Sequence, residues 1–178
     1  AWLHDCGKLS TPDSVLDKAT KLHLMHDGID TVHVRFASLR QQKIAAFYQA
    51  IAENPAARAE LQVTLDNALA QLEADRQFIA TANKGGEFMA PEAKERVKQI
   101  AAQQWLDADN QLQPLLTDME IYNLCIERGT LTGEERGVIN NHMAVTIDML
   151  ESLPFPKKLR RVPEYAGGKK KKMDGTGF

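Results

Sequence analysis

The stretch IDTVHVRFASLRQQKIAAFYQAI, residues 29–51, places its apolar side chains at intervals of three and four residues. That spacing brings them onto one face of an α-helix. After a break at residues 54–55, which contains proline, the same spacing resumes over residues 61–79 and ends at two glycines, residues 85–86. Two long amphipathic helices joined by a short break predict an antiparallel helical hairpin over residues 29–83.

Helical spacing also extends to both sides of this hairpin. A helix is expected to begin after Pro91 and to reach Trp105, residues 107–117 are polar and predict an irregular connector, and another helix is expected to end at Gly129. β-Branched residues nowhere alternate over the length of a strand. The sequence therefore predicts an all-α fold without internal repeats.

The sequence predicts two more helix N-termini. Thr11, followed by Pro12, predicts the N-cap of a short helix. Thr132 and Glu135 have the spacing of a capping box, in which each side chain satisfies the other residue's backbone N–H. The helix that follows Thr132 has an apolar side, which comprises Val138, Ile139, Met143, Ile147 and Leu150. A last helix is expected over residues 158–166.

Composition excludes several classes of protein. The chain has 178 residues, of which 43% are hydrophobic, and it contains two cysteines, Cys6 and Cys125. Two cysteines are too few for a disulfide framework, and no apolar run has the length of a membrane span or the flanks of a signal peptide. We expect a single cytoplasmic domain that makes no direct membrane contact.

The net charge of −2 hides an uneven distribution. Residues 154–178 carry eight basic and two acidic side chains, so this segment is +6 and the remainder is −8. A basic cluster attracts phosphates or nucleic acid. The alternative for its lysine run, Lys169 to Lys172, is a solvated chain end.

Two sites in the sequence could carry metal chemistry. His4 and Asp5 are adjacent, so an imidazole nitrogen and a carboxylate oxygen could reach one ion, while Gly7 allows close approach and Lys8 could face a phosphate. His142 is the second candidate. Taken singly, the pair could equally be a surface feature and His142 a hydrogen-bonded core residue. The other histidines, His23, His26 and His33, are interpreted as ordinary polar positions.

The chain ends in a glycine-rich segment that predicts a tight loop. Its residues are Asp174, Gly175, Thr176, Gly177 and Phe178.

Together these motifs resemble a known family. The run His4-Asp5-Cys6-Gly7-Lys8-Leu9, followed by Pro12, Val15, Leu16 and Lys18, is similar to the HD signature of the HD-GYP group of metal-dependent phosphohydrolases. Leu131 to His142 resembles the family's second helix, whose histidine is a metal ligand. Leu159 to Phe178 resembles its His-His-Glu-x-x-Asp-Gly-x-Gly-Tyr-Pro stretch, with Phe178 at the tyrosine position.

The resemblance implies a fold and an activity. The fold is an HD-type helical bundle, here with the 29–83 hairpin inserted after the HD helix, and the domain covers residues 1–178 as a fragment truncated at both ends. The activity is hydrolysis of cyclic dinucleotides such as cyclic di-GMP by two or three divalent metal ions, commonly iron or manganese. Metal ions of this kind activate water and stabilise the departing oxygen.

The resemblance also assigns roles to residues. His4, Asp5 and His142 would be metal ligands, Asp5 and Lys8 would be catalytic, and the glycine loop would contact the substrate or a signalling protein. Lys169, Lys170 and Lys171 stand where the family has His-His-Glu. Because an ammonium group has no lone pair for a metal, we expect at most one ion in this chain.

Three hypotheses remain open. The first is a cyclic dinucleotide phosphodiesterase, represented by an incomplete or altered chain. The second is a degenerate module that binds a cyclic dinucleotide or a signalling partner without turnover. The third is a helical scaffold in which His4-Asp5 is coincidental. The family often forms the cytoplasmic part of a larger sensor protein; the oligomeric state and the sensed signal are left open.

Overall fold

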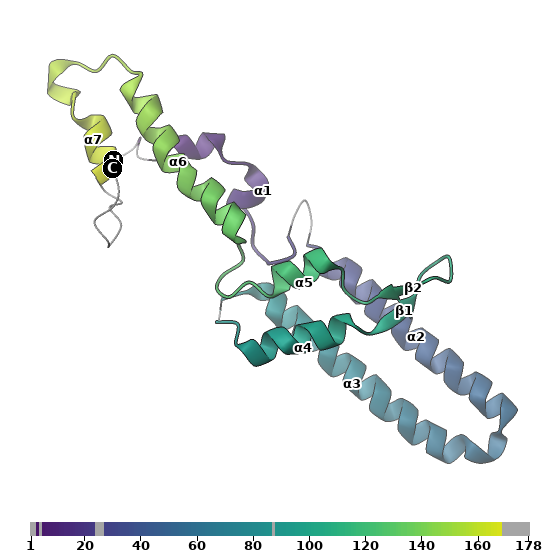
Figure 1. Ribbon diagram of the computed structural model, residues 1–178. Coiled ribbons are helices and arrows are strands. Elements are labelled where there is room, and N and C mark those ends of the chain that lie inside the picture. Colours follow the sequence, from purple (N-terminus) through teal and green to yellow (C-terminus); the bar gives the residue numbers. More distant parts are fainter. Residues whose placement is uncertain (1–2, 4, 24–26, 87, 169–178) are drawn as a thin grey trace. The chain divides into compact units, whose positions relative to one another are not determined.

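The computed structural model describes residues 3, 5–23, 27–86 and 88–168, and helices dominate this part of the chain (Figure 1). The two strands found there are three residues each. The prediction of an all-α fold is therefore confirmed.

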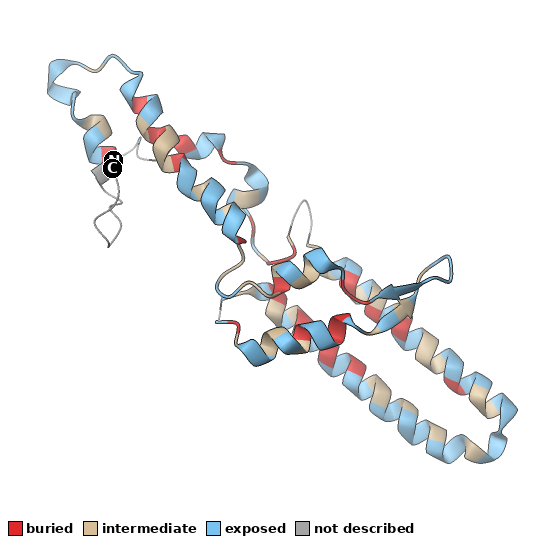
Figure 2. Cartoon of the chain, viewed as in Figure 1, coloured by how far each residue is buried: buried red, intermediate tan, exposed pale blue. Residues whose placement is uncertain are grey.

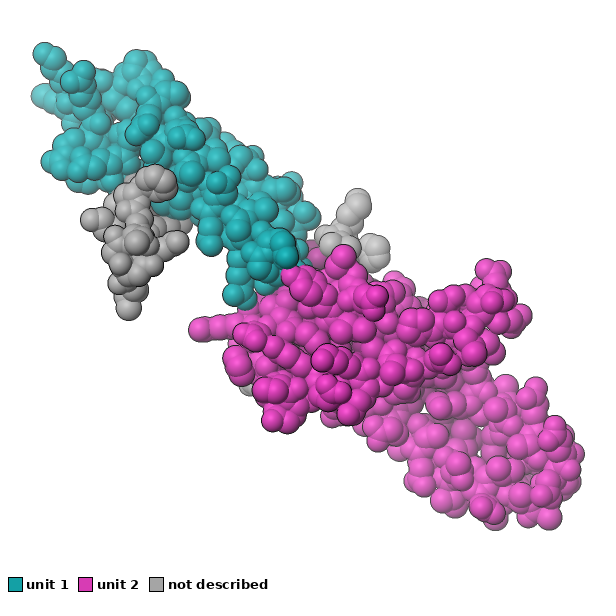
Figure 3. All heavy atoms as spheres, viewed as in Figure 1, with its two compact units in different colours: residues 1–18, 131–178 teal, residues 19–130 magenta. Residues whose placement is uncertain are grey.

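The chain divides into two compact units (Figure 3). Unit 1 comprises residues 1–18 and 131–178, and unit 2 comprises residues 19–130. The segment that resembles the HD signature and the segment that contains His142 thus belong to one unit, although the whole of unit 2 separates them in the sequence. The HD-GYP-like domain over residues 1–178 stays a prediction.

The predicted hairpin forms the long arm of unit 2 (Figure 1). Helix α2 (Ile29–Glu53) is followed by a 3₁₀ turn, η2 (Pro55–Ala57), and by α3 (Arg58–Lys84). Gly85 ends α3 with a φ of 66°, a conformation that glycine adopts without steric strain. A Cβ atom at this position would also lie 2.9 Å from the Gly129 carbonyl oxygen, so the turn requires glycine for two reasons.

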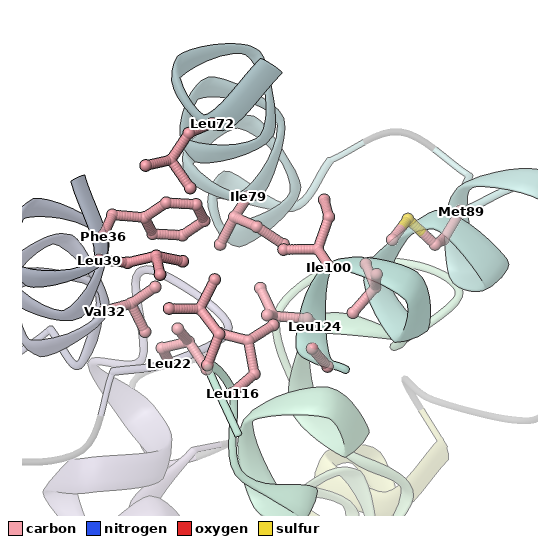
Figure 4. Packing of buried hydrophobic residues seen from close by; sticks show 13 residues of the cluster. Leu22, Val32, Phe36, Leu39, Leu72, Ile79, Met89, Ile100, Leu116 and Leu124 are labelled. Atoms are coloured by element: carbon pink, nitrogen blue, oxygen red, sulfur yellow. The ribbon is translucent and has the colours of Figure 1, made fainter. Parts of the chain in front are cut away.

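The core of unit 2 lies at the base of the hairpin, where helices α4 (Pro91–Ala101) and α5 (Asp118–Leu124) cover it (Figure 4). Most of the hairpin's distal half is exposed or partly exposed (Figure 2). The hairpin is therefore part of a larger inserted unit with its own core. The buried residues of this core are Leu22, Val32, Phe36, Leu39, Leu72, Ile79, Met89, Val97, Ile100, Ala101, Leu115, Leu116 and Leu124.

The prediction for residues 91–117 was wrong in part. Helix α4 (Pro91–Ala101) ends before Trp105, which lies in β1 (Gln104–Leu106). β1 pairs antiparallel with β2 (Leu112–Pro114), so the expected irregular connector is a β-hairpin. Strands of three residues are too short to show alternation. Their turn depends on the Asp107 carboxylate, which accepts backbone N–H groups from Asp109 and Gln111.

The next helix, α5 (Asp118–Leu124), is shorter than predicted because Cys125 already ends it. Thr117 and Glu120 form a capping box at its start, which the sequence analysis missed. The predicted capping box of Thr132 and Glu135 is confirmed and opens helix α6 (Gly133–Glu151).

In unit 1, residues Cys6–Ser10 form a 3₁₀ helix, η1. Helix α1 (Asp13–Leu16) has Pro12 at its N-cap, so the prediction that Thr11 would cap it was wrong; Thr11 is buried. At the other end of the unit, a 3₁₀ turn, η3 (Lys157–Leu159), precedes α7 (Val162–Gly168), which begins four residues later than predicted.

The buried face of α6 differs from the predicted apolar side. Its buried residues are His142, Thr146 and Leu150, which are spaced by one helical turn, whereas Val138 is 42% exposed. Two of these three residues are polar because this face receives η1, whose backbone needs hydrogen-bonding partners.

Among the described residues, none of the helices combines the length and the hydropathy that crossing a membrane would take.

Candidate metal-binding and catalytic site

The site is built where η1 packs against α6 in unit 1. Asp5 precedes η1, and its Oδ1 atom lies 3.7 Å from Nε2 of His142. The His142 side chain is 5% exposed and that of Asp5 is 31% exposed, so the pair lies at the edge of the unit's interior. The structure therefore brings together two of the three ligands that the sequence predicted.

Gly7 makes this close packing possible. A Cβ atom on Gly7 would lie 2.0 Å from the His142 carbonyl oxygen and 2.5 Å from Oγ1 of Thr146. Any side chain would push η1 away from α6, and Asp5 would move with it. The prediction that Gly7 permits a close approach is confirmed, and what approaches is the backbone of α6.

The imidazole of His142 is oriented by its own helix. Its Nδ1 atom contacts the carbonyl oxygen of Ile139. A carbonyl oxygen can only accept a hydrogen bond, so Nδ1 donates its proton to Ile139, and Nε2 is the ring nitrogen that faces Asp5. Metal-binding histidines commonly donate their second ring N–H to a carbonyl or carboxylate in this way.

Lys8 lies on the other side of the Asp5 carboxylate. Its Nζ atom is 2.9 Å from Oδ2, and the Lys8 side chain is 46% exposed. The two oxygens of Asp5 thus face different groups, with Oδ1 toward His142 and Oδ2 toward Lys8. The Lys8 ammonium group is thus paired with Asp5 and partly open to solvent. Its role toward a phosphate stays a prediction.

The donor set suits a divalent metal ion. Two atoms that each bind one ion at roughly 2.0–2.2 Å can lie up to about 4.4 Å apart, which includes the 3.7 Å measured here. An imidazole nitrogen with a carboxylate oxygen is a combination that iron, manganese and zinc accept. Among the described residues, however, no group of three or more His, Cys, Asp or Glu side chains is placed to hold an ion.

The remaining predicted site residues lie outside the described residues. They are His4, Lys169, Lys170, Lys171, Asp174, Gly175, Thr176, Gly177 and Phe178, and His26 is also outside. Their roles stay predictions. His23 and His33 belong to unit 2.

The sequence analysis missed the residues that hold the site together. Thr146 hydrogen-bonds to both η1 and α6, and the Lys18 ammonium binds the Glu135 carboxylate. The available signal for Thr146 was its position one turn after His142, on the same face of α6.

Comparison with protein families gives a match for the C-terminal part of the chain. A family model described as an HD domain matches residues 116–178, about a third of the chain. The match includes His142 and the three lysines at 169–171, and it excludes His4, Asp5 and Lys8. No curated protein and no solved structure matches the chain.

HD domains are typically metal-dependent hydrolases and bind divalent metals. The matched segment supplies His142, and the fold places Asp5 of the unmatched N-terminal segment beside it. Residues 116–178 are therefore similar to an HD domain of the metal-dependent phosphohydrolases.

Proposed function

We propose that the chain is a phosphodiesterase domain of the HD-GYP type, whose substrate class is the cyclic dinucleotides, such as cyclic di-GMP. The observation that carries the proposal is the contact of Asp5 with His142 across η1 and α6. It pairs the HD signature with the histidine that the family uses as a ligand. The resemblance of residues 159–178 to the HD-GYP stretch supports the narrower assignment.

A divalent metal, when bound, would supply a water of lowered pKa and a positive charge for the phosphate oxygens. His142 would present Nε2, and Asp5 would present Oδ1, with His4 as the third ligand. Lys8 would hold Oδ2 of Asp5 in place while its exposed ammonium group contacts the scissile phosphate. Iron or manganese is the metal we propose.

The lysines at 169–171 limit this chemistry. Because they cannot ligate a metal and repel it by their charge, we expect one weakly held ion and negligible turnover of cyclic di-GMP by the chain with its present residues. One ion cannot both generate the nucleophile and hold the phosphate and the leaving oxygen as a multi-metal site does.

The test compares the chain with the variant Lys169→His/Lys170→His/Lys171→Glu in manganese or iron, by metal stoichiometry and by release of linear dinucleotide. The control variant, Lys157→His/Lys158→His/Arg160→Glu, makes the same charge change elsewhere in the basic segment. We expect added metal and turnover only in the first variant, and loss of both when Asp5→Asn is added to it. Equal turnover by chain and variant would refute this interpretation of the lysines.

The second candidate is a module that binds a cyclic dinucleotide, or a signalling protein through the glycine loop, without hydrolysis. It is favoured by the +6 charge of residues 154–178, in which Lys157, Lys158 and Arg160 are exposed. Such binding should weaken steeply with added salt. If no variant hydrolyses the dinucleotide while the unaltered chain binds it, this candidate replaces the first. For either candidate we propose a cytoplasmic location.

A further inference from the structure

Thr146 is a polar side chain that is fully buried inside unit 1. Its Oγ1 atom donates a hydrogen bond to the His142 carbonyl oxygen at 2.7 Å. The same atom accepts the backbone N–H of Gly7 at 2.9 Å. One hydroxyl group therefore satisfies two backbone groups that belong to different segments of the chain.

Both of these backbone groups belong to residues at the Asp5–His142 pair. Gly7 is two residues after Asp5, and the carbonyl is that of His142 itself. The backbones of η1 and α6 are in direct contact here, because a Cβ on Gly7 would overlap the His142 carbonyl oxygen. The hydroxyl group thus sets how η1 sits on α6 at the point where the two predicted ligands meet.

We propose that Thr146 is a positioning residue, which holds Asp5 Oδ1 and His142 Nε2 at the separation that a shared divalent ion requires. This inference rests on the proposed function only where it assigns a metal ion to Asp5 and His142; the positioning of the two side chains does not depend on it. The alternative is a local helix contact, since Thr hydroxyls often bond to the carbonyl four residues earlier. Thr81 makes that contact with Gln77 at 3.0 Å on an exposed face, and within the described part of the chain its hydroxyl bonds to no second segment.

The experiment compares three variants with the unaltered chain at one fixed pH. Thr146→Val removes the hydroxyl and keeps the shape, whereas Thr146→Ser keeps the hydroxyl. Thr132→Ala is the stability control, because it removes the cap of the same helix without touching the pair. The readouts are the ¹⁵N resonances of the His142 imidazole without metal, and Mn²⁺ affinity by calorimetry.

Thr146→Val should shift the His142 resonances and weaken Mn²⁺ binding by about 10–100-fold, the usual effect of removing a group that orients a ligand. Thr146→Ser and Thr132→Ala should resemble the unaltered chain in both readouts. Unchanged His142 resonances and unchanged affinity in a folded Thr146→Val protein would overturn the inference. A Thr132→Ala effect as large as that of Thr146→Val would overturn it as well, since general loss of stability would then explain both.

Gly7→Ala changes the η1 side of the same contact, and it replaces Thr146→Val as the test if that variant does not fold. It should reproduce the shift of the His142 resonances, and unaltered resonances in a folded Gly7→Ala protein would count against the inference. If the unaltered chain binds no Mn²⁺, the metal role of the pair fails. The positioning role is then decided by the His142 resonances alone, so the two failures are distinguishable.

Discussion

Lys18 and Glu135 form an ion pair in which Nζ of Lys18 lies 2.9 Å from both carboxylate oxygens. The Lys18 side chain is 1% exposed and that of Glu135 is 21% exposed. Glu135 also accepts the N–H of Thr132 in the capping box. The pair therefore ties the segment after α1 to the first turn of α6, the helix that carries His142.

The two halves of this pair should respond unequally to substitution. Glu135→Gln leaves the buried ammonium without its carboxylate but keeps a residue that suits the capping box, so we expect unit 1 to lose about 3–5 kcal/mol of stability. Lys18→Met removes the buried charge and leaves a carboxylate near solvent, so the loss should be smaller. Chemical denaturation of both variants and of the double variant measures the difference.

The control is Glu95→Gln in the exposed pair of Glu95 with Lys98, whose atoms are 3.7 Å apart. Exposed pairs contribute about 0–1 kcal/mol. A larger loss for Lys18→Met than for Glu135→Gln would show that the buried charge is not the deciding factor.

Asp27 should make the stability of unit 2 depend on acid. Burial opposes ionisation of its carboxyl, but hydrogen bonds from Ile29 N–H, Thr20 and Asn83 outweigh this and lower the pKa below the ordinary 3.8. A lowered pKa in the folded state means that the carboxylate stabilises unit 2 above pH 3.8 and that this contribution is lost as pH falls through the lower, folded-state pKa. Asp27→Asn should flatten the acid limb of a plot of unfolding free energy against pH.

Asp109→Asn, in the exposed turn between the strands, is the matched control. We expect its acid limb to follow that of the unaltered chain. If Asp27→Asn keeps the full acid dependence, other carboxylates are responsible for it.

Lys21 holds the end of α5. Its side chain is buried, and Nζ donates to the carbonyl oxygens of Leu124 at 2.8 Å and Ile126 at 3.0 Å. Burial lowers the pKa of this ammonium group, although the nearby Cys125 opposes the shift. Lys21→Met leaves two carbonyls without this donor, and we expect a loss of about 1–3 kcal/mol. Hydrogen exchange should show the C-terminal turn of α5 opening first, and unaltered exchange there would contradict this role.

The distal half of the hairpin should be dispensable for the site. Residues 44–68 contribute Phe47 to the buried hydrophobic residues, whereas the core positions of α2 and α3 lie nearer the base. Replacing 44–68 by a glycine-rich linker should therefore leave unit 2 folded and Mn²⁺ affinity unchanged. Deleting all of 29–83, in contrast, removes core residues such as Phe36 and Ile79 and should unfold unit 2.

Circular dichroism and calorimetry on the two deletions check this expectation. Loss of Mn²⁺ binding by the shorter deletion, with the helical spectrum retained, would show that the distal half contributes to the site.

Local features of this protein follow from the sequence because their physical causes are local. The apolar spacing of residues 29–51, the glycine that ends α3, and the Thr132–Glu135 capping box each depend on residues within a few positions of one another. The residue types of the candidate ligands, Asp5 and His142, were also readable. Their roles as metal ligands stay predictions.

The tertiary structure alone decided which distant groups meet. The β-hairpin at 104–114 has strands too short for a periodic signal, and β1 is held against α2 by Gln42, whose side-chain amide bonds to the backbone N–H and carbonyl oxygen of Leu106. Thr146 and Lys18 have no local reason to be buried. A polar side chain is stable inside a protein only where it finds a partner, and their partners, Gly7 and Glu135, are separated from them in the sequence by all of residues 19–130.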